Sequence, residues 1–221
     1  EIPFEMSREE LRAELQKCID ANEINHGMLY WQCSRGTTYR GHQFPPATVK
    51  PNLMIFTVPC DLIPFDKTFR LISMEDTRFL HCNIKTLNLI PNCMAMQRAV
   101  EADCDEVVFH RGDRVTEGAH SSLAIIRDGV FCTPPADELI LPSITRKHFL
   151  ELCSRLGIPS RIAPFTVDEL LTADEIMILS TGSHCIAVCE VDGRPVGGKA
   201  PALLSRMQQA YQQEFLEGTE K

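Results

Sequence analysis

The most informative stretch of the chain is HCNIKTLNLIPN, residues 81–92. Its lysine, Lys85, follows a short run of apolar and polar residues, 79–84, and the turn formers Asn88 and Pro91 come after it. A lysine at the end of a strand can be held in a pocket, where burial favours the neutral amine. A neutral amine is a nucleophile that forms Schiff bases with carbonyl groups. Because most lysines are solvated surface residues, this interpretation depends on the rest of the chain.

Composition limits the classes of protein that the chain can be. Its 221 residues are enough for one large or two modest domains. The formal net charge of −8, without a long basic run, gives no electrostatic footprint for nucleic acid or an anionic membrane. No apolar run reaches the roughly 18 residues that span a bilayer, and the first residues do not resemble a signal peptide. We therefore expect a cytoplasmic protein.

The ten cysteines do not form a metal motif. The sequence contains no CxxC and no paired Cys/His spacing of the kind that binds zinc, so no metal site is expected. Several cysteines, such as Cys18, Cys33 and Cys189, occupy apolar positions of expected helices and strands, where cysteine behaves as a small hydrophobic residue. Reduced thiols are the favoured interpretation over disulfides.

Periodicity and turn signals predict a mixed α+β fold. A capping box at Ser7–Glu10 begins a helix that ends near Asn22. Hairpin turns are expected at Gly112-Asp113, Asp128-Gly129 and Asp192-Gly193. The expected strands are 28–34, 52–58, 69–74, 106–110, 115–117, 122–126, 130–133, 161–165, 175–180 and 185–191, and the further helices are 91–102, 143–156, 166–173 and 200–215.

Three segments besides Lys85 carry polar groups suited to a charged ligand. Glu117 ends a short strand beside Gly118, where a carboxylate can meet a protonated ring nitrogen, although a solvated turn glutamate is the alternative. Ser143–Arg146 resembles a helix N-terminus with backbone amides suited to phosphate, and Ser180–Ser183 is a turn of hydroxyls. Either of the last two could be only a cap or a turn. Together with Lys85, these groups suit pyridoxal phosphate, a phosphorylated ring aldehyde.

The chain resembles the fold-type IV pyridoxal-phosphate family, which contains D-amino-acid aminotransferases, branched-chain aminotransferases and aminodeoxychorismate lyases. The matching motifs stand in the family's order and span residues 34–181. They are Ser34–Thr37 with Tyr39–Pro45, Ile84–Asn88, Val115–Gly118, Ile144–Arg146, and Ala173–Glu175 leading to Ser180-Thr181. The resemblance implies a large mixed α/β domain, expected at residues 47–221, and part of a smaller N-terminal α/β domain at residues 1–46.

The resemblance also implies a role for each matching site residue. Lys85 is the Schiff-base lysine and proton carrier, and Glu117 pairs with the pyridine nitrogen. The backbone of Ile144 and Thr145, with the hydroxyl of Thr181, holds the phosphate. The cofactor implied is pyridoxal 5'-phosphate.

Arg40 and His42 match the RxH loop of D-amino-acid aminotransferases, which binds the substrate carboxylate. Arginine grips a carboxylate with a planar fork, and histidine adds a second donor; a solvated loop pair is the alternative. In that group the loop reaches the active site of the other subunit, which implies a homodimer.

Three departures from the family pattern stand out. The family has a further N-terminal segment with a phosphate-binding arginine and a substrate-side tyrosine, and we expect the natural protein to extend beyond Glu1 accordingly. Ser143 replaces the usual glycine before Ile144. His120-Ser121-Ser122 replaces the expected Ser-Asn pattern after the Glu-Gly motif.

The function expected is D-amino-acid transamination, from D-alanine or a similar D-amino acid to 2-oxoglutarate, with small amino and keto acids as partners. The alternatives are a branched-chain L-amino-acid aminotransferase, an aminodeoxychorismate lyase and a degenerate, non-catalytic pyridoxal-phosphate-binding protein. The Arg40-Gly41-His42 loop favours the D-specific interpretation.

Overall fold

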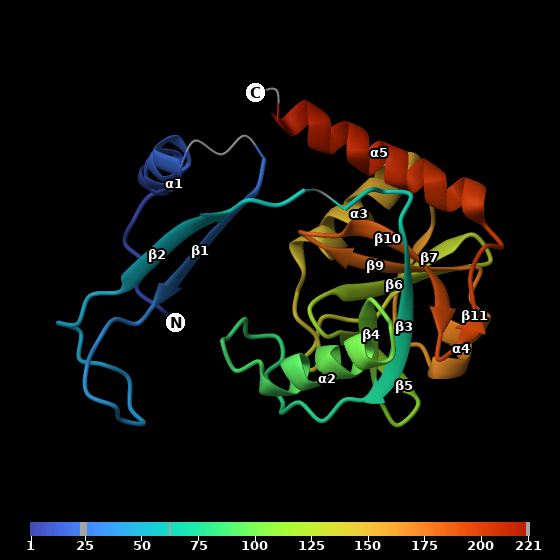
Figure 1. The fold of residues 1–221 in the computed structure, drawn as a ribbon, viewed down its shortest axis with the longest axis horizontal. Helices are drawn as coiled ribbons and strands as arrows, with labels where there is room; N and C mark the ends of the chain where they lie inside the picture. The colour runs from blue at the N-terminus through green and yellow to red at the C-terminus, as the bar shows by residue number, and fades with distance from the viewer. Residues whose placement is uncertain (23–25, 62, 220–221) are drawn as a thin grey trace. The chain divides into compact units, whose positions relative to one another are not determined.

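The computed structural model describes residues 1–22, 26–61 and 63–219, which form two compact units divided between residues 62 and 63. The first unit has helix α1, Arg8–Asn22, and an antiparallel pair of strands, β1, Met28–Ser34, and β2, Asn52–Val58 (Figure 1). The capping box of α1 is confirmed: the amide of Glu10 donates to Ser7 Oγ at 3.2 Å, and the amide of Ser7 donates to Glu10 Oε2 at 2.7 Å.

A long loop, residues 35–51, joins β1 to β2. Near its start is Gly36, whose φ of +101° puts it in a region that favours glycine, and a Cβ there would lie 2.1 Å from the carbonyl oxygen of Lys50. The sequence predicts a large domain that begins at residue 47. In the structure, β2 pairs with β1 along its whole length, and the chain from residue 47 to residue 61 groups with the first unit.

The second unit contains nine strands and four helices in the part of the chain that the structure describes. The strands are β3 (Thr68–Glu75), β4 (Glu106–Arg111), β5 (Arg114–Gly118), β6 (Ser122–Arg127), β7 (Val130–Thr133), β8 (Ser160–Ile162), β9 (Glu175–Ser180), β10 (His184–Val191) and β11 (Arg194–Pro195). The helices are α2 (Ile90–Glu101), α3 (Ile144–Leu156), α4 (Val167–Thr172) and α5 (Pro201–Thr219).

These strands form one mixed sheet in the order β5-β4-β3-β10-β9-β6-β7-β8, with β11 paired to β10. The pairs β3–β4, β3–β10 and β7–β8 are parallel, and the other pairs are antiparallel. All three predicted hairpins form, and Asp128-Gly129 and Asp192-Gly193 have positive φ at both residues, as their tight turns require. The mixed α+β class is therefore confirmed.

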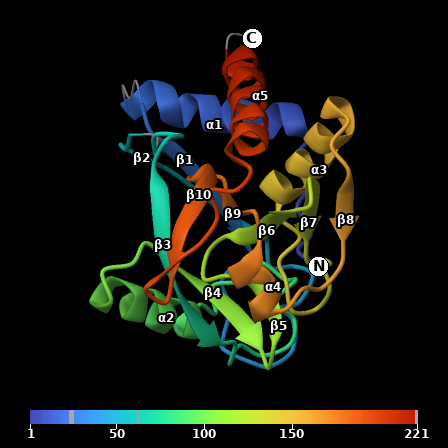
Figure 2. The same cartoon turned by 90° about the vertical axis from the view of Figure 1, so that its right-hand side faces the viewer.

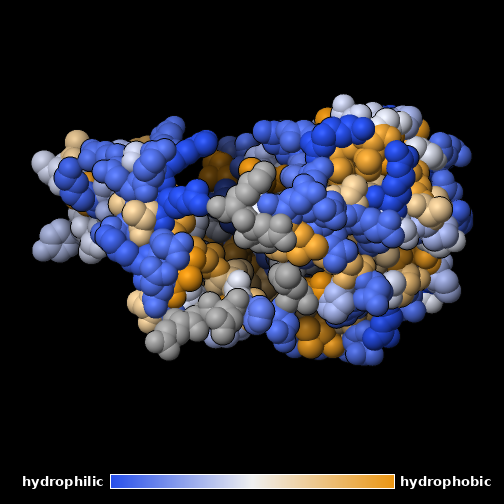
Figure 3. Space-filling model, turned by 90° about the horizontal axis from the view of Figure 1, so that it is seen from above, coloured by the Kyte–Doolittle hydropathy of each residue, from blue (hydrophilic) through white to orange (hydrophobic). Residues whose placement is uncertain are grey.

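The helices of the second unit cover the sheet and bury three apolar clusters. Helices α3 and α5 lie over one part of the sheet, and α2 lies over another (Figures 1 and 2). Phe149 of α3 and Met207 of α5 are fully buried against β6 and β9 residues such as Ala124 and Leu179. The outer surface over α5 is a mixture of hydrophilic and apolar residues (Figure 3). No helix within the described residues is both long and apolar enough to cross a membrane.

The structure differs from the sequence prediction mainly at the ends of elements. The strand expected at 161–165 is shorter in the structure, where β8 covers Ser160–Ile162. Beyond β8 the chain bonds to a different strand, since the carbonyl of Phe165 accepts from the amide of Val115 in β5 at 3.0 Å. Helix α4 is capped by Thr166, whose Oγ1 accepts from Glu169 N at 3.1 Å. The closing helix runs to Thr219 rather than to 215.

Candidate active site

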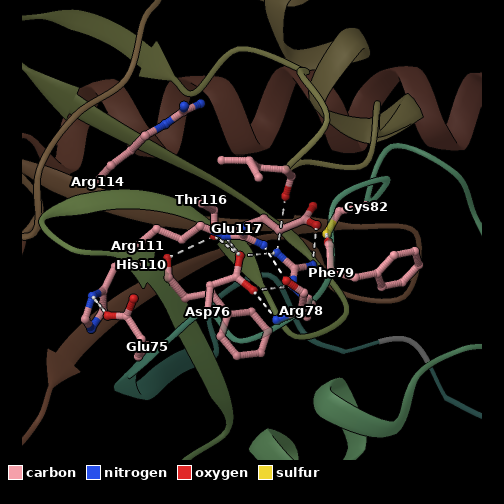
Figure 4. Close-up of polar contacts among 12 residues, drawn as sticks. Glu75, Asp76, Arg78, Phe79, Cys82, His110, Arg111, Arg114, Thr116 and Glu117 are labelled. Carbon is pink, nitrogen blue, oxygen red and sulfur yellow. Dashed lines mark hydrogen bonds and ion pairs between the residues drawn. The ribbon is translucent and has the colours of Figure 1, made fainter.

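Glu117 belongs to a buried ion-pair cluster whose members are joined by Arg78. It is the fourth residue of β5 and only 5% exposed. Its Oε1 accepts from Arg78 Nη1 at 2.6 Å, and its Oε2 accepts from the amide of Leu141 at 3.1 Å. Arg78 also grips Asp76 through Nε and Nη2, each at 2.9 Å (Figure 4). The structure therefore rejects the interpretation of Glu117 as a solvated turn residue.

Two opposing effects determine the pKa values in this cluster: burial favours the neutral form of each group, and pairing with an opposite charge favours the ionised form. Burial raises the pKa of Glu117 to about 7, although Arg78 and the Leu141 amide act in the opposite direction. Burial alone would also raise the pKa of Asp76, but its bonds to Arg78 outweigh it and the pKa is lowered. Arg78 stays charged, because its two acidic partners raise its pKa despite burial. A further cation beside Glu117, such as a protonated ring nitrogen, would favour the ionised carboxylate.

The turn after Glu117 is fixed by a second buried carboxylate. Glu106, the first residue of β4, is fully buried and accepts from Ala119 N at 3.1 Å and from Ser121 Oγ at 2.8 Å. Its Oε2 lies 2.8 Å from His120 Nδ1. A Cβ at Gly118 would lie 2.2 Å from Ser121 Oγ and would displace the hydroxyl that donates to Glu106. The glycine of the Glu-Gly motif thus makes room for the turn.

The predicted phosphate-binding amides stand at the first turn of α3. Ser143 caps this helix, since its Oγ accepts from the amide of Arg146 at 3.2 Å. Ile144 is 78% exposed, whereas Thr145 is buried. The first amides of a helix have no acceptor within it and favour an anion. Leu141, which donates to Glu117, is three residues before Ile144, so the chain itself keeps this helix end near Glu117.

Thr181 begins the turn between β9 and β10 and is exposed. The turn is closed by Ser183, whose amide donates to Ser180 Oγ at 3.0 Å and whose hydroxyl lies 2.6 Å from the same oxygen. Leu179 pairs with Ser122, the first residue of β6. Thr181 therefore lies at the end of β9 next to the start of β6, which the chain enters five residues after Glu117.

Lys85 is not at the end of a strand, and that expectation was wrong. Strand β3 ends at Glu75, and residues 76–89 form a loop in which Lys85 is exposed. The strand ends there because Asp76 and Arg78, two residues apart, bond to each other and turn the chain inward. The loop is also held by the amide of Cys82, which donates to the carbonyl of Glu138 at 2.8 Å. Lys85 is therefore three residues along the chain from Cys82, whose backbone amide is fixed by this hydrogen bond.

Arg40 and His42 belong to the first unit, on the loop between β1 and β2, and both are exposed. The same loop is held by Arg35, whose guanidinium lies 3.5 Å from the centre of the Phe44 ring. Their predicted contact with a substrate carboxylate stays a prediction.

Sequence reasoning missed the residues that organise the cluster. Asp76, Arg78 and Glu106 were not selected as candidates, although all three are buried and charged. The available signal was the run Glu75-Asp76-Thr77-Arg78 directly after an apolar strand and before the Lys85 motif. Charged residues are rarely buried unless they are paired, so burial could not be read from residue type.

The donor set of the second unit fits pyridoxal phosphate. A buried carboxylate suits the ring nitrogen, and the amides at the start of α3 with the Thr181 hydroxyl suit a phosphate. Lys85 supplies an amine on the loop that Arg78 joins to Glu117. The fold and these groups define a fold-type IV pyridoxal-phosphate enzyme.

Comparison with known proteins gives the family. The model of the family described as amino-transferase class IV matches residues 1–191, and the chain belongs to this family. It is a pyridoxal-phosphate-dependent aminotransferase by class. The D-alanine aminotransferase of Staphylococcus aureus (strain MSSA476) is 36% identical over 215 residues, which cover 96% of this chain and 76% of that protein.

Solved structures of the same fold are also similar. The branched-chain amino acid aminotransferase of Escherichia coli has a TM-score of 0.81 at 25% identity, covering 95% of this chain and 71% of that one. Another branched-chain amino acid aminotransferase, whose structure contains pyridoxamine 5'-phosphate, has a TM-score of 0.82 at 25% identity, covering 96% and 72%. A putative 4-amino-4-deoxychorismate lyase from Legionella pneumophila has a TM-score of 0.80 at 22% identity, covering 95% and 79%, and shows the fold alone.

Proposed function

We propose that the protein is a D-amino-acid transaminase that moves an amino group from D-alanine, or a similar D-amino acid, to 2-oxoglutarate. The observation that carries this proposal is the 36% identity to a D-alanine aminotransferase over 96% of the chain. The branched-chain enzymes of similar fold are 25% identical. The Arg40-Gly41-His42 motif supports the same choice.

In this proposal the residues of the second unit bind and orient the cofactor. Pyridoxal phosphate supplies, when bound, an aldehyde that condenses with amines and a ring that accepts an electron pair. The amides of Ile144 and Thr145 and the hydroxyl of Thr181 would hold its phosphate. Glu117, held in its buried position by Arg78 and the Leu141 amide, would accept a hydrogen bond from the protonated ring nitrogen and keep that proton on the ring.

Lys85 and the loop of the first unit act on the substrate. The amine of Lys85 would hold the cofactor through its aldehyde carbon; once the substrate amine has displaced it, the freed amine would take the proton from the substrate Cα and return it as an acid. Arg40 and His42 bind the substrate carboxylate. We propose a cytoplasmic homodimer in which this loop serves the partner subunit's site.

Substrate tests separate the proposal from its alternatives. The protein loaded with pyridoxal phosphate is given D-alanine, L-leucine or aminodeoxychorismate, each without an acceptor. The proposal predicts pyruvate from D-alanine and conversion of the cofactor to its amine form. Conversion by L-leucine alone would favour a branched-chain enzyme, and release of 4-aminobenzoate from aminodeoxychorismate would favour the lyase. Bound cofactor that reacts with none of the three would favour a non-catalytic binding protein.

A further inference from the structure

Arg78 connects its own loop to three residues that are far from it in the sequence, Glu117, Leu139 and Arg111. Through Nη1 it bonds Glu117 of β5 at 2.6 Å, and through Nη2 it bonds the carbonyl of Leu139 at 3.3 Å. Its own carbonyl accepts from Arg111 Nη2 at 2.6 Å. Arg78 stands in the loop that carries Lys85, and Leu139 precedes the capped start of α3.

The guanidinium of Arg78 is buried and held in one orientation by its neighbours. Arg78 is 8% exposed, and its guanidinium carbon, Cζ, lies 4.7 Å from the centre of the Phe109 ring. The carboxylate of Asp76 binds Nε and Nη2 as a fork, and Asp76 is in turn held by Thr116 Oγ1 at 3.1 Å. Since Asp76 binds the Nε–Nη2 edge, the plane of the guanidinium is fixed, and one of the two N–H groups of Nη1 donates to Glu117.

These bonds hold the carboxylate of Glu117 in one orientation and leave it able to accept further hydrogen bonds. One donor occupies each carboxylate oxygen, and each oxygen keeps a second lone pair. Glu117 cannot rotate toward solvent without breaking a buried, charge-assisted bond. A lysine in place of Arg78 would keep the charge but could not donate in the same fixed directions to Asp76, Glu117 and Leu139.

We propose that Arg78 is a positioning residue for the reaction: it fixes the carboxylate of Glu117 against the cofactor ring and sets the Lys85 loop and the start of α3 around it. The proposal rests on the proposed function, because it takes Glu117 as the partner of the ring nitrogen. Arg78 acts through Glu117 and does not itself bind the ring.

The test uses 4-deoxypyridoxine 5'-phosphate, which has the ring and the phosphate but no aldehyde and so reports ring binding without Lys85. Its dissociation constant and the pH at which the bound ring loses its nitrogen proton are measured by absorbance for wild type, Arg78→Lys, Glu117→Gln and the double variant. We expect Arg78→Lys to weaken binding by about 10- to 150-fold, as for loss of one charge-assisted bond. The ring should also lose its proton at lower pH.

A double-mutant cycle checks that Arg78 acts through Glu117. In the Glu117→Gln background, Arg78→Lys should have a smaller further effect on affinity than in wild type, and no further effect on the pH at which the ring loses its proton. Arg127→Lys is the matched control, because Arg127 is 42% exposed and pairs at 2.7 Å with Glu169, which is not part of this cluster, and it should change neither quantity.

The outcomes are distinct. If Glu117→Gln changes affinity and pH midpoint but Arg78→Lys changes neither, the positioning role is overturned while the proposed function stands. If Glu117→Gln itself changes neither, the assigned role of Glu117 fails. Should Arg78→Lys not fold, Asp76→Asn loosens the same fork with Arg78 still present; a smaller loss of affinity in the same direction supports the proposal, and unchanged affinity overturns it.

Discussion

Arg78 Nη1 lies 2.6 Å from Glu117 Oε1, and both side chains are buried. The two residues are 39 positions apart in the sequence, on the Lys85 loop and on β5. The contact ties the loop that carries the proposed reactive amine to the acid proposed to face the ring nitrogen. The proposed chemistry of the candidate site would therefore rest on an ion pair that no sequence motif predicts.

Glu117→Gln should leave the cofactor bound and slow transamination. Glutamine keeps the shape and the acceptor for Arg78 but removes the negative charge opposite the ring nitrogen. Loss of a charge-assisted interaction predicts a rate about 10- to 150-fold lower for the D-alanine half-reaction, measured by stopped-flow absorbance. Exposed Glu138→Gln is the control. A half-reaction at the wild-type rate in Glu117→Gln would remove its assigned role.

Arg40→Ala should weaken binding of D-alanine and of 2-oxoglutarate alike, because both present a carboxylate to the same residues. A bidentate contact of this kind is worth roughly 1.5–3 kcal/mol, or about 10- to 150-fold in affinity. Steady-state kinetics with each substrate measure the loss, and cofactor absorbance should not change. Exposed Lys50→Ala, on the same loop, is the control cation. Unaltered kinetics for both substrates would contradict the preference for D-amino acids over branched-chain L-amino acids.

Ser143→Ala should destabilise the protein more than Ser143→Gly. Alanine removes the hydroxyl that accepts from the amide of Arg146 and costs about 0.5–2 kcal/mol of unfolding free energy, whereas glycine at an N-cap costs only about a few tenths. Urea unfolding of both variants measures the difference. Equal unfolding free energies for the two variants would show that the cap does not stabilise α3.

The Glu106–His120 pair predicts a pH-dependent stability. Its bond to Glu106 raises the pKa of His120 above the ordinary 6.5, so this stabilisation is full below pH 6.5 and is lost as pH rises through the raised value. Burial would raise the pKa of Glu106, but His120 and its other donors lower it below 4.5, so its contribution is full above pH 4.5 and lost as pH falls.

The corresponding measurement is the unfolding free energy of wild type and His120→Asn at pH 5.5 and pH 9. The difference between the two proteins should be larger at pH 5.5, where both partners are charged. A difference that is equal or larger at pH 9 would contradict the pairing.

Periodicity was sufficient for most of the elements, because hairpin turns such as Asp128-Gly129 and caps such as Ser7 are local signals. The position of Lys85 was not predictable in the same way. The Asp76–Arg78 pair that follows the end of β3 is held in place by buried bonds from Arg78 to Glu117 and Leu139, and burial of a charge depends on partners that are distant in the sequence.

The residues of the candidate site also fall into two groups, those with a local sequence signal and those whose role depends on distant partners. Glu117, Ile144 and Thr181 could be selected because strand ends, helix starts and hydroxyl turns have recognisable sequences. Asp76, Arg78 and Glu106 could not, because their function is to bond to those segments rather than to form a motif of their own.

Chemical trapping of the lysine tests the central claim most directly. The protein is loaded with pyridoxal phosphate and reduced with borohydride, which makes the bond between a lysine amine and the cofactor carbon permanent, and the labelled peptide is sequenced by mass spectrometry. We expect a single label on Lys85 and its loss in Lys85→Ala, with Lys67 and Lys147 unlabelled. A label on another lysine in the wild-type protein, with Lys85 unmodified, would contradict the assignment of Lys85 as the reactive amine.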